Sequence, residues 1–315
     1  MPGCRASPGR WSGTGRGRID EPPDRLARGM APAPRDPNDL MSVVERALAE
    51  DAPAGDLTGS SIVPASESCR AELRIKAPGV LAGTRVAQVV FDVVSKQDGL
   101  GSVDVEWKAS DGQRVESGDL VALLHGPARS ILRAERVALN FLTHLSGIAT
   151  LTRAFVDAAT PARVLCTRKT TPCLRAIERE AVSAGGGDLH RASLSDAVLI
   201  KDNHLRVAGG AGEAVRRARA ALLPGEIEVE AETLEELEDA LVAGADRILL
   251  DNPGPDLVRQ AVARVGDPDR LEVSGGITLD SIQSLVEAGA RVISVGRITH
   301  SAPSLDISLE VLGAG

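Results

Sequence analysis

Short apolar runs recur at regular spacing in the second half of the chain. Amphipathic segments such as Thr233–Ala243, Asp256–Val265 and Leu279–Glu287 lie between most of these runs. Continuous apolar strands that alternate with helices are typical of a parallel sheet that is buried on both faces. The pattern predicts a parallel α/β barrel, complete or incomplete, with strands at Arg163–Cys166, Ala197–Ile200, Ile227–Val229, Arg247–Leu250, Leu271–Val273 and Val292–Val295.

The first half of the chain mixes the two periodicities. Helical spacing or strict alternation predicts helices at Leu40–Glu50 and Thr84–Val94 and strands at Arg70–Ile75 and Val103–Trp107. Asn38–Asp39 is expected to cap the first helix. A long helical pattern follows over residues 130–159, and Gly147 is expected to break or bend it.

Residues 1–37 are rich in Gly, Pro and Arg and show no periodicity, so we expect a disordered extension. The acidic residues Asp20, Glu21 and Asp24 argue against an organellar transit peptide, because such peptides are poor in acids. Translation that begins at Met30 or Met41 is the alternative explanation.

Composition narrows the classes of function. The 315 residues carry a formal net charge of -8, and aromatic residues make up 2% with no Tyr. Such a chain repels nucleic acid and anionic lipid and lacks platforms for stacking bases. No apolar run approaches membrane-spanning length. The charge, the few aromatic residues and the lack of such a run predict neither nucleic acid nor membrane as a partner. The four cysteines form no CxxC pair, which indicates reduced thiols and a cytoplasmic location.

Polar residues and glycines follow the predicted strands at the points where the strands end. In chain order the six strands are followed by Arg168 with Lys169, Lys201, Glu230, Asp251, Ser274 with Gly275, and Gly296. The C-terminal ends of parallel barrel strands form one rim, and active sites are built there. We therefore expect these residues to meet in one catalytic mouth.

Cations are concentrated in three segments near this rim. TRKTTP (167–172), GGGDLHR (185–191) and IKDNH (200–204) supply Arg168, Lys169, His190, Arg191 and Lys201, and two of the chain's five lysines are among them. Arginine matches carboxylate or phosphate with a planar fork, whereas lysine acts as a mobile point charge. In an acidic protein this cluster predicts a small polyanionic substrate. The alternative is that each cation pairs with a surface carboxylate.

Carboxylates and glycines complete the expected mouth. Glu230 and Asp251 could hold Mg²⁺ that bridges diphosphate oxygens, or stabilise positive charge on a sugar, or merely cap the helices that follow. The glycines of SGGIT (274–278) and VGRITHS (295–301) let backbone N–H groups approach a phosphate. A phosphate site on the last two strands is a recurring feature of barrels.

Seven segments together resemble the signature blocks of the quinolinate phosphoribosyltransferase family. They are ERVALNFLTHLSGIAT (135–150), TRKTTP, AGGGDLHR, SDAVLIKDNH (195–204), EIEVEAETLEEL (226–237), ILLDN (248–252) and LEVSGGIT (271–278). The resemblance implies an α/β fold in which a smaller α/β sandwich domain (38–145) precedes an open, incomplete α/β barrel (146–299). The tail, about residues 300–315, would pack back on the first domain.

The same resemblance implies an enzyme that transfers phosphoribose from phosphoribosyl pyrophosphate to quinolinate with decarboxylation. The products are nicotinate mononucleotide, pyrophosphate and CO₂, and the pathway is NAD biosynthesis. Mg²⁺ is the implied cofactor, and the implied assembly is a homodimer or a hexamer of dimers with shared active sites. The implied roles are quinolinate binding by Arg136, Arg168, His190, Arg191 and Lys201, catalysis by Lys169, Glu230 and Asp251, Mg²⁺ contact through Glu230 and Asp251, and 5′-phosphate binding by Ser274, Gly275 and Gly296.

The chain departs from the family pattern at a few positions. Cys173 stands where the family usually has glycine, Glu180 replaces a common aromatic residue and Ser193 replaces a common glycine. Three alternative functions remain: a molybdate-transport-associated homologue of the same fold, another phosphate-binding barrel such as an indole or thiazole synthase, and a non-catalytic binding module. The ERxxLN and IKDNH blocks argue against the first, and the HR and IKDNH blocks against the second.

Overall fold

The computed structural model describes residues 40–221 and 225–314 of the chain. The extension expected at 1–37 and the cap expected at Asn38–Asp39 lie outside the described residues. Residues 37–315 form one compact unit. Within its described part, no helix has both the length and the apolar character needed to cross a membrane.

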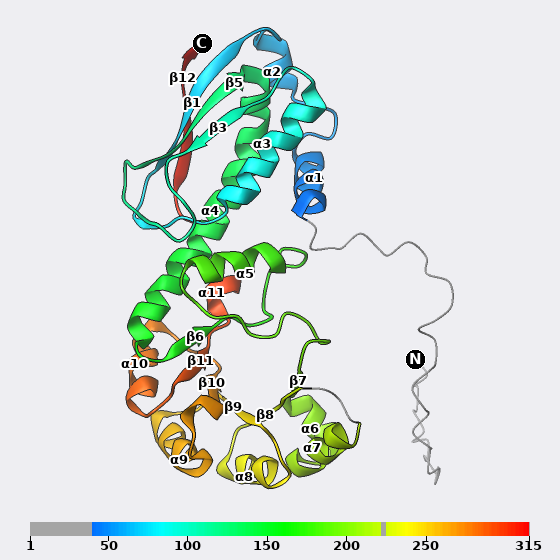
Figure 1. Cartoon of the computed structure of the whole chain (residues 1–315), viewed down its shortest axis with the longest axis vertical. Helices are drawn as coiled ribbons and strands as arrows, with labels where there is room; N and C mark the ends of the chain where they lie inside the picture. The colour runs from blue at the N-terminus through cyan, green and yellow to red at the C-terminus, as the bar shows by residue number, and fades with distance from the viewer. Residues whose placement is uncertain (1–39, 222–224, 315) are drawn as a thin grey trace, which may run out of the picture. The chain divides into compact units, whose positions relative to one another are not determined.

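A four-stranded antiparallel sheet forms the core of the N-terminal part. Its strand order is β12-β1-β5-β3, with β1 (Ser68–Ile75), β3 (Asp104–Trp107), β5 (Leu120–Pro127) and β12 (Ile307–Ala314). Ala71, Leu73 and Ile75 of β1 are fully buried, because alternate side chains of a strand point to one face. The last strand, β12, pairs with β1, so the end of the chain completes this sheet (Figure 1).

Helices cover this sheet (Figure 1). Three of them lie where the apolar periodicity predicts them: α1 (Leu40–Asp51), α3 (Thr84–Asp98) and the long α4 (Ala128–Ala159). The short helix α2 (Leu57–Ile62) was not predicted. Helix α3 buries Val86, Val90 and Phe91, packs against α4 and contacts α1. The short strands β2 (Gly79–Val80) and β4 (Arg114–Val115) pair with each other, and α4 packs on β2.

Helix α4 runs through Gly147 without a break, so of the two outcomes expected there, a break or a bend, the break is wrong. The physical reason for the glycine is a tertiary contact, because a Cβ atom at position 147 would lie 2.1 Å from the carbonyl oxygen of Pro303. Because Gly147 has no side chain, the segment that leads into β12 has room to pack against α4. Helix α4 also spans the domain boundary expected at residues 145 and 146, and it packs on α3 on one side and on β6 on the other.

The second sheet is parallel and open. Its order is β6-β11-β10-β9-β8-β7, with β6 (Arg163–Leu165), β7 (Val198–Ile200), β8 (Ile227–Ala231), β9 (Arg247–Asp251), β10 (Leu271–Ser274) and β11 (Val292–Ser294). Among the described strands, β6 and β7 are the two edges and do not pair with each other. The prediction of an open α/β barrel is confirmed.

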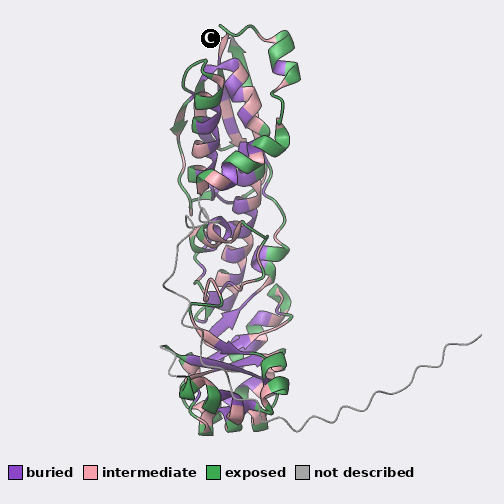
Figure 2. Ribbon diagram, turned by 90° about the vertical axis from the view of Figure 1, so that its right-hand side faces the viewer, coloured by how far each residue is buried: buried purple, intermediate pink, exposed green. Residues whose placement is uncertain are grey.

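Helices follow the strands of this barrel along the chain. They are α5 (Arg175–Ala184), α6 (Asp202–Ala208), α7 (Ala211–Ala220), α8 (Leu234–Val242), α9 (Pro255–Val265), η1 (Pro268–Arg270), α10 (Leu279–Glu287) and α11 (Arg297–His300). Helices α7, α8 and α9 pack on the strands from outside (Figure 1). The strands are buried while the outer faces of these helices are exposed (Figure 2). This arrangement leaves the C-terminal strand ends to build a site.

Candidate active site

The strand ends bring the predicted residues together. Asp251 at the end of β9 pairs in register with Ser274 at the end of β10. On the next strand, the Ser294 hydroxyl donates a hydrogen bond of 2.9 Å to the Ser274 hydroxyl. The rim predicted from the sequence therefore exists, and all of its predicted residues except Glu230 border one or both of two adjoining cavities.

The first cavity contains all five predicted cations in its lining. It has a volume of about 120 Å³ and is bordered by Arg168, Lys169, His190, Arg191, Lys201, Asp251 and Ser274 from the predicted set, together with Glu272 and Ser294. Burial lowers the pKa of Arg191, and the nearby Arg168 lowers it further. The Nε atoms of Arg168 and Arg191 are buried and have no hydrogen-bond partner among the described residues. Crowded, unpaired donors of this kind are suited to an anionic ligand.

The second cavity is lined by small residues. It has a volume of about 220 Å³ and shares Lys169, Ser274 and Ser294 with the first. Gly275 has φ of 90°, and a Cβ atom there would lie 2.4 Å from the Asn252 side-chain oxygen, so only glycine fits. The predicted Gly275 and Gly296 border this cavity, and so do Arg297, His300 and Ser301, which the sequence interpretation passed over although they lie in its VGRITHS segment.

Helix α5 holds the two cation-bearing loops in place. Its Arg175 donates to the Thr170 hydroxyl at 3.0 Å and to the Ala192 carbonyl at 2.8 Å. One turn later, Arg179 donates to the His190 carbonyl at 2.6 Å. Residues four apart lie on the same helix face, so one face of α5 fixes both loops.

A buried carboxylate ties the first loop to α4. Glu178 of α5 is fully buried, and its Oε1 lies 2.9 Å from His144 Nε2 of α4. Its Oε2 accepts a hydrogen bond from the backbone N–H of Thr171. The loop that carries Arg168 and Lys169 is thereby anchored to the long helix.

The two predicted carboxylates differ in their partners. Glu230 is 6% exposed, and its Oε2 accepts a hydrogen bond of 2.7 Å from Lys201 Nζ. Asp251 accepts a hydrogen bond from the Asn252 side-chain amide. Burial raises the pKa of Asp251, and the negative charge of Glu230 raises it further, whereas Lys201 and Lys169 lower it. The site therefore has two acidic groups close to each other and close to both lysines.

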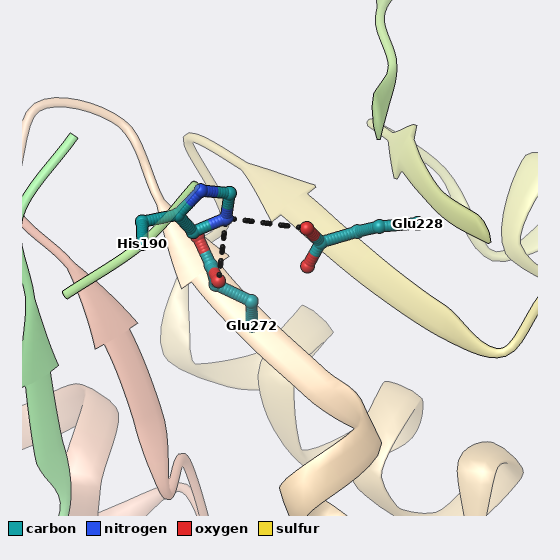
Figure 3. A group of neighbouring side chains, drawn as sticks. All are labelled: His190, Glu228 and Glu272. Atoms are coloured by element: carbon teal, nitrogen blue, oxygen red, sulfur yellow. Dashed lines mark hydrogen bonds and ion pairs between the residues drawn. The ribbon is translucent and has the colours of Figure 1, made fainter. Parts of the chain in front are cut away.

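His190 lies above a pair of acids that sequence reasoning missed. Its Nε2 is 3.2 Å from Glu228 Oε2 and 3.4 Å from Glu272 Oε2 (Figure 3). Hydrogen bonds to Glu228 and then Glu272 raise the pKa of His190 to about 9. The available signal was the interruption of the apolar runs of β8 and β10 by Glu228 and Glu272. Glu228 also shares its strand face with Glu230, two residues away.

Arg136 lies apart from the other predicted site residues. It is exposed on α4 and borders neither cavity. Its side chain makes no hydrogen bond or ion pair with any residue in 40–221 or 225–314.

Comparison with known proteins agrees with this geometry. Residues 56–146 match the family model described as quinolinate phosphoribosyl transferase, N-terminal domain, and residues 148–310 match the corresponding C-terminal domain. Together these matches span most of the chain.

The chain belongs to the quinolinate phosphoribosyl transferase family.

Individual relatives match this chain over most of their own length. A Bacillus subtilis protein named "Probable nicotinate-nucleotide pyrophosphorylase [carboxylating]" is 42% identical over 275 residues, which are 86% of this chain and 93% of that protein. A chloroplastic nicotinate-nucleotide pyrophosphorylase from Oryza sativa subsp. japonica is 39% identical, over 90% of this chain and 80% of that protein. The solved nicotinate-nucleotide pyrophosphorylase of Francisella tularensis is 37% identical with a TM-score of 0.81, over 87% of this chain and 96% of that one.

The three residues that depart from the quinolinate phosphoribosyl transferase pattern lie outside both cavities, and the backbone or neighbouring residues around each one fit it. Cys173 has φ of 67°, a left-handed conformation that explains why glycine is usual at this position. Glu180 forms an exposed ion pair of 2.6 Å with Arg85. Ser193 and Asp196 bond to each other in the loop after Arg191. None of these three residues borders either of the two cavities.

Proposed function

We propose that the protein transfers phosphoribose from phosphoribosyl pyrophosphate to quinolinate with loss of CO₂, giving nicotinate mononucleotide and pyrophosphate in NAD biosynthesis. The observation that carries this proposal is the pair of adjoining cavities, which share Lys169 and Ser274. One is lined by cations and suits a dicarboxylate. The other is lined by glycine and serine and suits a phosphate.

Quinolinate would occupy the cationic cavity. Its two carboxylates would receive hydrogen bonds from Arg168, Arg191 and Lys201. The unpaired Nε atoms of Arg168 and Arg191 support this placement. His190, which contacts two carboxylates, borders the same cavity and would also bind quinolinate.

The phosphoribosyl group would occupy the second cavity. Ser274, Gly275 and Gly296 would bind the 5′-phosphate through hydroxyl and backbone N–H groups. Lys169 borders both cavities and would contact the diphosphate as it leaves. Glu230 and Asp251 would face the ribose, where positive charge develops as pyrophosphate departs.

Mg²⁺ is the cofactor that fits these carboxylates. Asp251 and Glu230 are close enough for the charge of one to raise the pKa of the other, which is a pair that a cation stabilises. Mg²⁺ commonly binds one or two carboxylates plus substrate phosphates and water. Glu230 and Asp251 would hold the ion, which would neutralise charge on the diphosphate.

The chain's own residues would act chiefly by position and charge. The cations of the first cavity hold quinolinate with its ring nitrogen near the ribose, and they screen the repulsion between two anionic substrates. Attack by the ring nitrogen forms the glycosidic bond and leaves that nitrogen positively charged. When the bond between the adjacent ring carbon and its carboxylate breaks, this charge stabilises the electron pair that stays on the carbon and CO₂ leaves. A proton from water then forms the new C–H bond.

The active site would be shared between two subunits. Arg136 is exposed and without a partner in the described chain, and its helix borders neither cavity of its own subunit. In a two-fold pair each subunit can supply what the other lacks. We therefore propose a homodimer, or a hexamer built from such dimers, in which Arg136 enters the neighbouring cationic cavity.

A cytoplasmic location is part of the same proposal. Cys69, Cys166 and Cys173 are free thiols, as expected in a reducing compartment.

The proposed function is tested by the formation of nicotinate mononucleotide. Quinolinate with phosphoribosyl pyrophosphate should yield this product together with pyrophosphate and CO₂, and nicotinate should be a poor substitute because it lacks the second carboxylate. Failure with quinolinate under conditions that support a known family member would contradict the proposal.

A further inference from the structure

Two loops carry the arginines whose Nε atoms lack a partner in the cationic cavity. Arg168 lies between β6 and α5, and Arg191 lies between α5 and β7. Both side chains line the cationic cavity, and the Nε atom of each is buried without a hydrogen-bond partner among the described residues. A dicarboxylate can bind both arginines at once only if their separation matches that of its carboxylates. A residue that sets this separation therefore determines which dicarboxylates fit.

The two loops are joined at their base by backbone pairing. Leu165 and Asp188 form a parallel β-bridge, and the Cys166 N–H donates a hydrogen bond of 3.0 Å to the Asp188 carbonyl. Beyond this bridge the loops extend to Arg168 and Arg191. Burial lowers the pKa of Arg191, and the positive charge of Arg168 lowers it further, so these two like charges repel each other. The loops therefore need a further contact to hold the two arginines at a fixed separation.

Arg175 of α5 supplies that contact. Its Nε donates to the Thr170 hydroxyl at 3.0 Å, and its Nη2 donates to the carbonyl of Arg168 itself at 3.3 Å. Its Nη1 donates at 2.8 Å to the carbonyl of Ala192, the residue after Arg191. The three nitrogens belong to one planar guanidinium group, so this side chain fixes the distance between the two backbone segments.

The contacts of Arg175 are to neutral acceptors and lie outside the site. Arg175 forms no ion pair with any carboxylate in residues 40–221 and 225–314, and it borders neither cavity. A lysine would preserve the positive charge, but its ammonium group is a single point charge that cannot donate to three acceptors in the directions of a planar fork. Replacement by lysine therefore separates a geometric role of Arg175 from an electrostatic one.

We propose that Arg175 is a positioning residue that holds Arg168 and Arg191 at the separation of two carboxylates on adjacent ring carbons; this inference rests on the proposed function. Arg175 acts on the ligand through these two arginines. Without it the two loops move relative to each other, and each arginine still attracts a carboxylate but no longer at a fixed separation. The expected loss is one of selectivity between isomeric dicarboxylates, which a general loss of stability or of charge would not produce.

The test compares the binding of benzene-1,2-dicarboxylate and benzene-1,3-dicarboxylate by titration calorimetry. Both carry the same charge and are unreactive because they lack the ring nitrogen, and they differ in the separation of their carboxylates. The wild-type enzyme should bind the 1,2 isomer at least about 10-fold more tightly, the effect of one charged hydrogen bond. Arg175→Ala and Arg175→Lys should each weaken the 1,2 isomer about 10-fold or more and the 1,3 isomer less than about threefold. Arg175→Lys also serves if Arg175→Ala does not fold.

Arg270→Ala is the matched control. Arg270 is likewise half-buried and donates to two backbone carbonyls, those of Asp246 and Ala245, but it precedes β10 and borders neither cavity. This variant should keep the wild-type selectivity even where its stability is lower.

Four outcomes would overturn the assignment of Arg175. They are equal affinity of the wild-type enzyme for the two isomers, wild-type selectivity in Arg175→Lys, equal weakening of both isomers in the Arg175 variants, and loss of selectivity in Arg270→Ala. Absence of product from quinolinate with the wild-type enzyme would instead contradict the proposed function.

Discussion

At the scale of single residues, the cations of the site differ in whether the protein itself supplies their hydrogen-bond partners. Lys201 is bound to Glu230, whereas Arg168 and Arg191 keep buried, unpartnered Nε atoms. A buried donor without a partner is costly, so an anion that supplies the partner gains affinity. The sequence could predict which cations gather, but not which of them remain unpaired, because pairing depends on strand register and loop geometry.

Arg168→Ala or Lys201→Ala should weaken quinolinate binding without unfolding the protein. Loss of a charged hydrogen bond costs about 1.5–3 kcal/mol, which corresponds to a roughly 10- to 150-fold higher dissociation constant. Titration calorimetry measures this directly. Arg216→Ala, an exposed cation on α7, is the control and should bind as the wild type does. Unchanged affinity in both site variants would contradict the assigned ligand.

The raised pKa of His190 predicts a pH dependence of stability. The folded chain holds the proton up to about pH 9, whereas the unfolded imidazole releases it near pH 6.5. The stabilisation is therefore fully present below about pH 6.5 and is lost as the pH rises through about 9. Urea unfolding of the wild type should show this loss, and His190→Asn should show less of it. If the free energy of unfolding changed with pH to the same extent in both proteins, the raised pKa of His190 would not be the cause.

At the scale of elements, the sequence predicted most of what the structure contains. The six apolar runs match β6 to β11, because a parallel strand buried on both faces is mostly apolar. The prediction was wrong at Gly147, where low helix propensity indicated a break. The contact with the Pro303 carbonyl involves a residue 156 positions later, and local propensity contains no information about such an approach.

Gly147→Ala should lower stability, although alanine is the better helix former. Its Cβ atom would overlap the Pro303 carbonyl oxygen, so the segment that leads into β12 must shift. Overpacking of this kind costs about 1–3 kcal/mol. Chemical denaturation measures the change, and Asn140→Ala at an exposed position of the same helix should stay within about 0.5 kcal/mol of wild type. A gain in stability on Gly147→Ala would show that this contact is unimportant.

At the scale of the whole molecule, the proposed active site needs a second subunit. Arg136 and Arg168 would serve the same site from different chains. Arg136→Ala and Arg168→Ala enzymes should each be nearly inactive. After mixing and exchange, about half the dimers are hybrids with one intact site of two, so about a quarter of the wild-type activity should return. If exchange is demonstrated and activity does not return, Arg136 does not act across a dimer.

The activity of the whole molecule should also depend on a metal ion, because Mg²⁺ would connect the protein to the diphosphate. Activity should disappear in excess chelator and return on addition of Mg²⁺ or Mn²⁺. The measurement is the initial rate before and after the metal is restored. Full activity in excess EDTA would contradict the role proposed for Glu230 and Asp251.

The central claim is that two adjoining cavities bind the two substrates side by side. The most direct measurement is a crystal structure with quinolinate and an unreactive analogue of phosphoribosyl pyrophosphate. The account predicts both quinolinate carboxylates within about 3 Å of donors from Arg168, Arg191 and Lys201. It also predicts the 5′-phosphate at Ser274, Gly275 and Gly296. Quinolinate bound outside the cationic cavity, or the phosphate bound away from the two glycines, would contradict the account.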